Sequence, residues 1–298
     1  MTLMISDRFL KNIGEKPILL VGPTASGKSK IAMSLAMKLG RHIVNADSLQ
    51  VYSNWRILTA RPTIKDEEII PHHLYGHKAP DEEYSVGHWL RELSNILSTN
   101  KKIIIVGGTG LYFSALTEGL ANIPKISDET KIISEKRLLK YGIQDLLNDL
   151  DKETRESIDI KNPMRVIRAW EVLKETGKSL KKWQSETDPP ILPLTKCQPL
   201  VINPDKNDLN KKIRARFKEM IEMGALDEAK KNLDMWNKGV ITNKAIGASE
   251  LISYLKNEIS LDEAIANASI ATRQYAKRQR TWIKARMKQW DDVTELIG

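Results

Sequence analysis

The sequence has a single cysteine, Cys197, among its 298 residues. One cysteine excludes an intramolecular disulfide, and no Cys and His residues have the spacing of a structural zinc site. Apolar runs of membrane-spanning length are also missing, and Ser6, Asp7, Arg8 and Lys11 interrupt the apolar residues near the N-terminus, which leaves no signal-peptide core. These absences predict a soluble protein of the reducing cytoplasm with no membrane partner.

Acidic residues are fewer than basic ones, with 38 Asp and Glu against 47 Lys and Arg, a net charge of +9 and a pI of about 9.4. The excess predicts attraction to a polyanion, and nucleic acid is the leading candidate. Near the C-terminus, basic residues recur every three or four positions, which predicts one basic stripe on a helix over 260–290, or alternatively a face that is simply solvated. The stripe consists of Arg273, Lys277, Arg280, Lys284 and Lys288.

Short β-branched runs predict an α/β fold, a parallel sheet core flanked by helices. The first three runs each precede a turn-rich stretch and a helix-like segment, as buried parallel strands do. The first of these helices carries Ile31, Leu35 and Leu39 on one side and is expected to end at Gly40. The predicted strands lie at 17–21, 42–44, 102–106 and 199–202.

Between 126 and 196 the sequence becomes charged and helix-periodic, with no strand-like run. We therefore expect an inserted all-helical module at 126–196, between two parts of the core at 1–125 and 197–298. Its clearest helix should begin after the N-cap Asn162, with Pro163 as its first residue, and end at Gly177. Its apolar side would consist of Val166, Trp170 and Leu173.

The stretch 21–29 reads VGPTASGKS and has the spacing of a phosphate-binding loop between a strand and a helix. In such a loop Gly22 and Gly27 let backbone N–H groups converge on linked phosphates, Lys28 supplies a positive charge, and Ser29 reaches Mg²⁺. The loop alone leaves open whether the ligand is a nucleotide or another diphosphate.

An ordinary nucleotide hydrolase places a magnesium-organising aspartate at the end of another strand. Here the run at 102–106 ends in Gly107-Gly108-Thr109-Gly110 instead, and the aspartate, Asp47, follows the run at 42–44. That position is where ligands bind in open α/β sheets, so Asp47 could hold metal or take a proton. Alternatively, Asp47 and Ser48 could simply cap the next helix.

Six motifs together resemble the tRNA dimethylallyltransferases of the bacterial type. They are GPTASGKS at 22–29, DSLQVY at 47–52, TARP at 59–62, PHHL at 71–74, GGTGLY at 107–112 and TRQYAKRQRTW at 272–282. Members of that family transfer a dimethylallyl group from dimethylallyl diphosphate to the N6 amine of the adenine at tRNA position 37, beside the anticodon. The resemblance implies a phosphate loop that holds the diphosphate leaving group.

The resemblance also implies roles for individual residues. Asp47 would be the catalytic base, Thr109 would lie beside the adenine, Arg216 would approach the diphosphate, and Mg²⁺ would bind at Ser29. The diphosphate-binding set would be Gly22, Thr24, Ala25, Ser26, Gly27, Lys28 and Ser29.

The expected partner is a tRNA anticodon stem-loop bound by a monomer, with Gln50 reading the base edge. Besides Asp47 and Thr109, the residues expected to face the tRNA are Ser48, Leu49, Gln50, Lys131, Met164, Arg165, Val166, Ile167, Arg168, Arg273, Lys277, Arg280 and Lys284. The chain departs from the family at Ala248, where an aromatic residue is common, and at LTARP, 58–62, where GTAKP is common; both departures concern local tRNA contacts.

Three other functions stay open at this point. A small-molecule kinase would use the phosphate loop for ATP, an adenylate isopentenyltransferase would take a free nucleotide, and a noncatalytic RNA-binding protein would need neither the loop nor Asp47. The basic stripe and the inserted module favour the tRNA-modifying enzyme, because a small acceptor needs neither.

Overall fold

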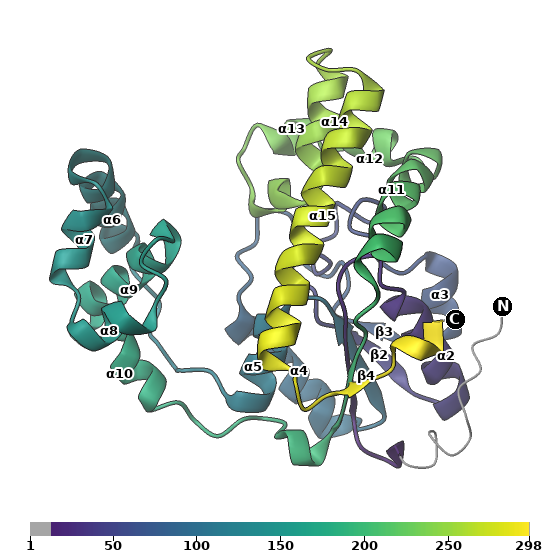
Figure 1. The fold of residues 1–298 in the computed structure, drawn as a ribbon, viewed down its shortest axis with the longest axis horizontal. Helices are drawn as coiled ribbons and strands as arrows, with labels where there is room; N and C mark the ends of the chain where they lie inside the picture. The colour runs from purple at the N-terminus through teal and green to yellow at the C-terminus, as the bar shows by residue number, and fades with distance from the viewer. Residues whose placement is uncertain (1–12, 298) are drawn as a thin grey trace. The chain divides into compact units, whose positions relative to one another are not determined.

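The computed structural model describes residues 13–297, so the N-terminal residues used for the signal-peptide prediction lie outside the described part. Its framework is one sheet of six parallel strands in the order β3-β2-β4-β1-β5-β6, which confirms the predicted fold class (Figure 1). The strands are β1 Ile18–Val21, β2 His42–Asn45, β3 His72–His73, β4 Ile103–Gly107, β5 Gln198–Val201 and β6 Asp291–Asp292.

The strand β1 lies at the centre of the sheet, and all four of its residues are fully buried. Val21 at its end is level with Gly107 of β4 on one side and with Val201 of β5 on the other. Asn45 of β2 is level with Val106 of β4. The loops after β1, β2 and β4 therefore leave the sheet at one edge, its carboxyl edge, where open α/β folds bind ligands.

The predicted strands form where β-branched residues are buried on both faces of the sheet. The edge strands β3 and β6, of two residues each, were not predicted from the sequence. The PHHL motif supplies β3, whose His73 Nε2 lies 3.0 Å from His42 Nδ1 on the neighbouring strand. A two-residue strand shows no periodicity of its own, and only its pairing with β2 or β5 defines it.

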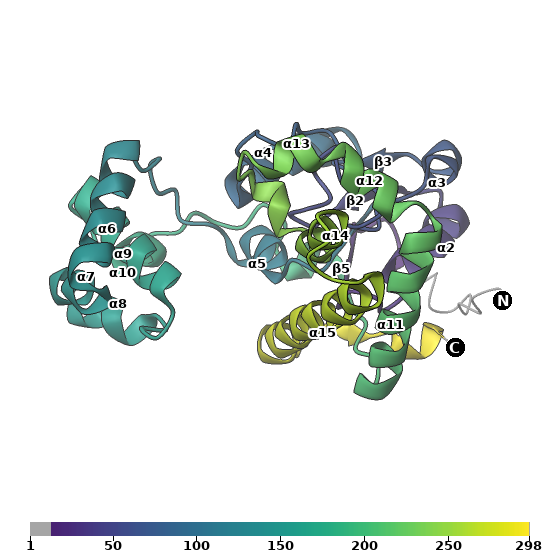
Figure 2. The same cartoon turned by 90° about the horizontal axis from the view of Figure 1, so that it is seen from above.

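The helices that belong to the sheet-containing unit flank this framework. The helix α2 ends as predicted, at Gly40, whose φ of 59° gives it the left-handed conformation common at helix ends. Two long helices, α11 and α15, lie side by side, and α14 packs on α15 (Figures 1 and 2). The helices are α2 Lys28–Leu39, α3 Ile64–Ile69, α4 Val86–Thr99, α5 Gly110–Glu118, α11 Lys206–Glu222, α12 Ala225–Lys231, α13 Leu233–Trp236, α14 Ala248–Leu255 and α15 Leu261–Arg286, with 3₁₀ segments η1 Leu194–Lys196, η2 Ile241–Lys244 and η3 Thr294–Ile297.

A second compact unit, residues Glu118–Ile191, consists of helices alone. Its bounds differ by several residues from the 126–196 expected for the inserted module. The predicted helix over 163–176 is present with Asn162 as N-cap and Gly177 as C-cap, and Val166 and Trp170 lie in the core of the unit. The helices are α6 Asp128–Tyr141, α7 Ile143–Asp149, α8 Lys152–Ser157, α9 Pro163–Thr176 and α10 Leu180–Ser185.

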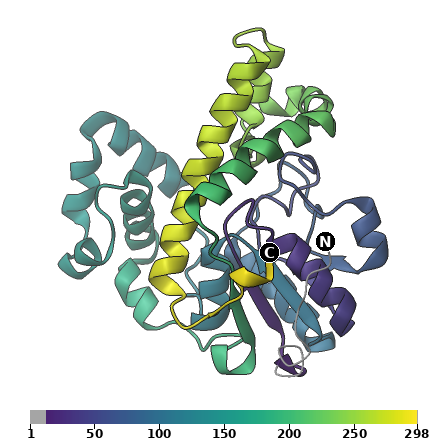
Figure 3. The same cartoon turned by 45° about the vertical axis from the view of Figure 1, so that its right-hand side comes forward.

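The long basic helix is shorter than the sequence predicts. It ends at Arg286, whereas the helical pattern was expected to continue to residue 290, so Lys288 lies outside it. The chain turns because Met287, Trp290 and Val293 are buried and because β6 pairs with β5 (Figure 3). Burial of these apolar side chains and strand pairing override the local preference for helix. None of the described helices is long and apolar enough to cross a membrane.

Candidate active site

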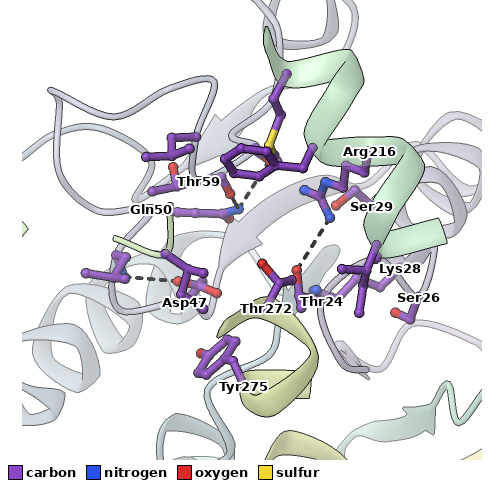
Figure 4. Close-up of a pocket in the computed structure, with 18 of the residues that line it drawn as sticks. Thr24, Ser26, Lys28, Ser29, Asp47, Gln50, Thr59, Arg216, Thr272 and Tyr275 are labelled. Carbon is purple, nitrogen blue, oxygen red and sulfur yellow. Dashed lines mark hydrogen bonds between the residues drawn. The ribbon is translucent and has the colours of Figure 1, made fainter. Parts of the chain in front are cut away.

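A cavity of about 340 Å³ lies at the carboxyl edge of the sheet. Figure 4 shows Thr24, Lys28 and Arg216 on one side of it and Asp47 and Gln50 on the other. The rest of its wall is apolar and consists mainly of Leu49, Leu58, Ile213, Phe217, Met220 and Ile246. The cavity thus combines charged groups on two sides with an apolar wall, and its size is that of a small-molecule site.

The phosphate loop connects β1 to the first turn of α2. Ala25 and Gly27 both have positive φ, 61° and 85°, which turns successive backbone N–H groups toward one concave surface. Gly22 is packed so closely that a Cβ there would lie 2.7 Å from Ser26 Oγ. The loop therefore has the convergent donors and helix N-terminus of an anion site.

Two cations face this loop. The Nζ of Lys28 donates to the Pro23 carbonyl at 3.3 Å, and Arg216 Nη1 lies 3.5 Å from Thr24 Oγ1. Burial lowers the pKa of Lys28 from 10.5 to about 8, Asp47 opposes that shift, and Arg216 adds to it. Burial also lowers the pKa of Arg216, against the influence of Asp47. Two cations near one carboxylate leave an excess of positive charge, which a bound anion would neutralise.

The carboxylate of Asp47 is held by its own turn. Its backbone N–H donates to Asn45 Oδ1 at 2.8 Å, and its Oδ1 accepts from the Leu49 N–H at 3.0 Å. Asn45 is fully buried, and its carbonyl accepts from Trp89 Nε1 at 2.7 Å. The residues after Asp47 form turns, and the next helix begins only at Ile64, so the alternative that Asp47 caps a helix is wrong.

Thr109 joins the loops after β2 and β4. Its Oγ1 accepts from the Ser48 N–H at 3.2 Å, and its own N–H donates to the Ala46 carbonyl at 3.3 Å. A Cβ on Gly107 would lie 2.0 Å from that carbonyl, so the close approach of the loops requires glycine. The structure places Thr109 beside Ser48, the residue after Asp47, and Thr109 is not among the described residues that line the cavity.

Gln50 lines the cavity and also fixes the neighbouring loop. Its Nε2 donates to the carbonyls of Thr59 at 2.7 Å and Ala60 at 3.2 Å. Both amide hydrogens are therefore used within the protein. A role for Gln50 in base reading would depend on its Oε1.

Comparison with known proteins places this site in a family. The family model described as IPP transferase matches residues 50–286, and the one described as Isopentenyl transferase matches residues 16–70, which include the phosphate loop. The chain belongs to the IPP transferase family.

Curated relatives and solved structures agree with this assignment. The chain is 50% identical over 279 residues to a tRNA dimethylallyltransferase of Cereibacter sphaeroides, covering 94% of this chain and 89% of that protein. It is similar to the crystal structure of a tRNA isopentenylpyrophosphate transferase from Bacillus halodurans, with 31% identity, a TM-score of 0.65 and coverage of 93% and 90%. It also resembles a eukaryotic dimethylallyltransferase described as acting on tRNA, with 26% identity, a TM-score of 0.80 and coverage of 95% and 75%.

In this IPP transferase only some residues of the predicted basic stripe are exposed to solvent. Arg273, Lys277 and Lys284 are exposed on α15, whereas Arg280 is half-buried and its Nε is buried with no hydrogen-bond partner among residues 13–297. The backbone N–H groups of Asn207 and Asp208 lower the pKa of Asp205, the N-cap of α11, and the positive charge of Arg280 adds a smaller contribution. Arg280 is therefore not equivalent to the other stripe residues.

The predicted tRNA-facing residues of the helical unit also differ in exposure. Met164 is 70% exposed, and Arg165 and Arg168 are exposed as well. Val166 is fully buried and Ile167 is partly buried against the same core, so the prediction that the Val166 side chain faces RNA is wrong. On the nearby helix α6, Lys131 Nζ lies 3.1 Å from Asp128 Oδ1.

Sequence reasoning missed three residues that α15 contributes to the site. Thr272 and Tyr275 line the cavity, and Gln279 contacts the phosphate loop from behind. Burial and the nearby Asp47 raise the pKa of Tyr275, which also lies within hydrogen-bonding reach of Thr109. These residues lie at helical spacing on the face of α15 opposite the stripe. The TRQYAKRQRTW motif contains all of them, but its basic residues predict only the exposed face.

The two departures from the family pattern lie inside the protein. Ala248 is fully buried at the start of α14, and Leu58 is buried and lines the cavity. The Nη1 of Arg61 donates to the carbonyls of Tyr52 at 2.9 Å and Ser53 at 3.1 Å. The Ala248 side chain therefore packs in the core.

Proposed function

We propose that this protein transfers a dimethylallyl group from dimethylallyl diphosphate to the N6 amine of the adenine at tRNA position 37, in the anticodon loop, and releases diphosphate. One observation carries the proposal: a single cavity brings together a phosphate loop, two cations, a carboxylate and an apolar wall. The names of its relatives, tRNA dimethylallyltransferases about half identical over nearly the whole chain, support the same reaction.

The diphosphate end of the substrate fits the phosphate loop. The convergent amides of the loop, the Thr24 hydroxyl, Lys28 and Arg216 would bind its oxygens and stabilise the charge that grows as the carbon–oxygen bond breaks. The hydroxyl of Ser29, exposed at the start of α2 and lining the cavity, fits Mg²⁺, which takes few protein ligands beside substrate phosphates. When bound there, Mg²⁺ would neutralise part of the diphosphate charge.

The adenine amine is a weak nucleophile because its lone pair is delocalised into the ring. As the nitrogen forms a bond to the allylic carbon, the bond from that carbon to the diphosphate oxygen breaks, and the amine must lose one proton. Asp47 would accept this proton, because its carboxylate lines the cavity opposite Lys28 and Arg216. The turn around Asn45 would keep Asp47 in position, and Thr109 would fix the neighbouring loop.

The five-carbon group would lie against the apolar wall, where Leu58, Phe217 and Met220 are buried. Water exclusion at this end would protect the allylic carbon from hydrolysis. The anticodon base would leave its stack to reach the cavity, as in other enzymes that act on a base. Gln50 would contact this base only through its Oε1, as a hydrogen-bond acceptor, because its Nε2 donates to the Thr59 and Ala60 carbonyls.

The proposed tRNA surface comprises the exposed face of α15 and, on the helical unit, Arg165 and Arg168. Lysine and arginine side chains there would neutralise RNA phosphates and position the stem-loop without reading its sequence. We propose that the protein works as a monomer in the cytoplasm.

The test is transfer from radiolabelled dimethylallyl diphosphate to three acceptors: tRNA with an unmodified adenine at position 37, the same tRNA with guanine there, and adenosine monophosphate. Label should enter only the first. Label on adenosine monophosphate would favour the free-nucleotide enzyme, and phosphoryl transfer from ATP in a parallel reaction would favour a kinase. RNA binding without any transfer would favour a noncatalytic protein.

A further inference from the structure

Gln279 is a buried amide placed between two loops of the proposed site. Its side chain belongs to α15 and is 6% exposed. Its Oε1 accepts from the Thr24 N–H of the phosphate loop at 2.8 Å, and its Nε2 donates to the Gly108 carbonyl, beside Thr109, at 2.9 Å. One side chain therefore joins the loop after β1 to the loop after β4.

Both sides of this contact are shaped for it. A Cβ on Gly108 would lie 2.1 Å from Gln279 Nε2 and would displace that amide, and a Cβ on Gly110 would lie 2.2 Å from the Trp282 ring. Tyr275, one turn earlier on α15, lies within hydrogen-bonding reach of both Gln279 and Thr109. The absence of side chains at Gly108 and Gly110 thus allows this face of α15 to pack closely against the site.

Glutamine suits this position chemically. A neutral amide of this length can accept from one backbone N–H and donate to one backbone carbonyl at the same time, at any pH. A glutamate would place a carboxylate against the Gly108 carbonyl, and an apolar side chain would leave the buried groups it meets without partners. The contact therefore requires both ends of the amide.

We propose that Gln279 is a positioning residue, which sets the phosphate loop relative to the loop of Thr109 and so aligns the allylic carbon with the adenine amine. The proposal rests on the function proposed above. Gln279 acts through Thr24 and Gly108, since it contacts their backbones. A displacement of about 1 Å between reacting groups can cost about a hundredfold in rate, so a small shift of either loop after loss of the amide would lower the rate of transfer measurably.

The test compares Gln279→Met, nearly the same size without the hydrogen bonds, with Gln184→Met, an exposed position on α10 that is not part of the proposed tRNA surface. We expect kcat of Gln279→Met to fall about 10- to 100-fold. The KM for tRNA should change less than about twofold, because the exposed face of α15 is untouched. Gln184→Met should match wild type in both parameters. A Gln279→Met enzyme with wild-type kcat and KM for both substrates, even with a lower melting temperature, would overturn the proposal.

A second variant covers the case in which Gln279→Met does not fold. In Gln279→Glu, a protonated carboxyl can accept from Thr24 and donate to Gly108 as the amide does, but a carboxylate cannot. The ratio of its kcat to that of wild type should rise as the pH falls, and a ratio independent of pH would contradict the proposal. Wild type is assayed in parallel: an inactive wild type refutes the proposed function itself, whereas an active wild type beside an unchanged variant refutes only the role of Gln279.

Discussion

Lys28 should destabilise the ligand-free protein while serving the reaction. Burial holds its pKa at about 8 instead of 10.5, so the folded protein binds the Lys28 proton less tightly than the unfolded chain does. Between these two pKa values the unfolded state binds more protons, and stability therefore rises with pH. The loss of folding stability caused by the buried Lys28 charge is fully present below about pH 8 and disappears as the pH approaches 10.5. Replacing Lys28 by methionine, which fills similar space without charge, should remove this cost.

The size of the effect follows from the two pKa values. Their difference, about 2.5 pH units, corresponds to about 3 kcal/mol at neutral pH, since each unit is worth about 1.4 kcal/mol. At pH 9.5 less than half of that cost should remain. The observed gain should be smaller than the full value, because methionine cannot replace the hydrogen bond from Nζ to the Pro23 carbonyl.

The assay is urea denaturation of wild type and Lys28→Met at pH 7 and at pH 9.5, with kcat/KM for dimethylallyl diphosphate measured on both. We expect Lys28→Met to be the more stable protein at pH 7, by less at pH 9.5, and to lose at least about a hundredfold in kcat/KM. Titrating groups that do not interact with Lys28 cancel, because the comparison is between two otherwise identical chains. A less stable variant at pH 7, or a stability difference that grows with pH, would refute the reasoning.

The remaining predictions concern the base and the RNA surface. Asp47→Asn keeps the shape of the turn but cannot take a proton, so turnover should fall by about 10²- to 10⁴-fold with diphosphate binding nearly intact; near-normal turnover in a transfer assay would remove Asp47 as the base. The double variant Lys277→Gln, Lys284→Gln should bind tRNA more weakly and flatten the slope of log affinity against log salt by about 1 to 2. The pair Lys38→Gln, Lys101→Gln, exposed at the opposite edge of the sheet, is its control, and an unchanged slope in the first pair would exclude α15 as the RNA surface.

Local sequence features predicted the parts of the fold that local forces determine. The buried strands and the helix with Asn162 and Gly177 as caps were found because β-branched runs and capping residues act within a few positions. The cavity residues on the loops after β1 and β2 were found because motif spacing fixes them. The strand β6 and the turn at Arg286 were missed, because burial of side chains and pairing with β5 decide them.

The contact from Gln279 to Thr24 could not be predicted from spacing, because 255 residues separate the two. A stripe of charge on a helix predicts a surface, but it does not say which of its members the rest of the fold will cover. Arg280 is half-buried on a helix that packs beside α11, and nothing within its own helix indicates this. Such contacts are tertiary, and only the assembled fold defines them.

The arrangement of α15 has a consequence for how RNA binding and chemistry are related. Its 26 residues form one continuous helix, whose exposed face carries Lys277 and Lys284 and whose opposite face carries Tyr275 and Gln279. Because Gln279 ties α15 to the Thr24 N–H and to the Gly108 carbonyl, RNA phosphates bound on the outer face would be held at a fixed distance from the cavity. Contacts that carry no sequence information would then still place the target base relative to Asp47. Substitutions on the outer face should therefore change tRNA affinity and those on the inner face should change kcat, although both lie within three turns of the same helix.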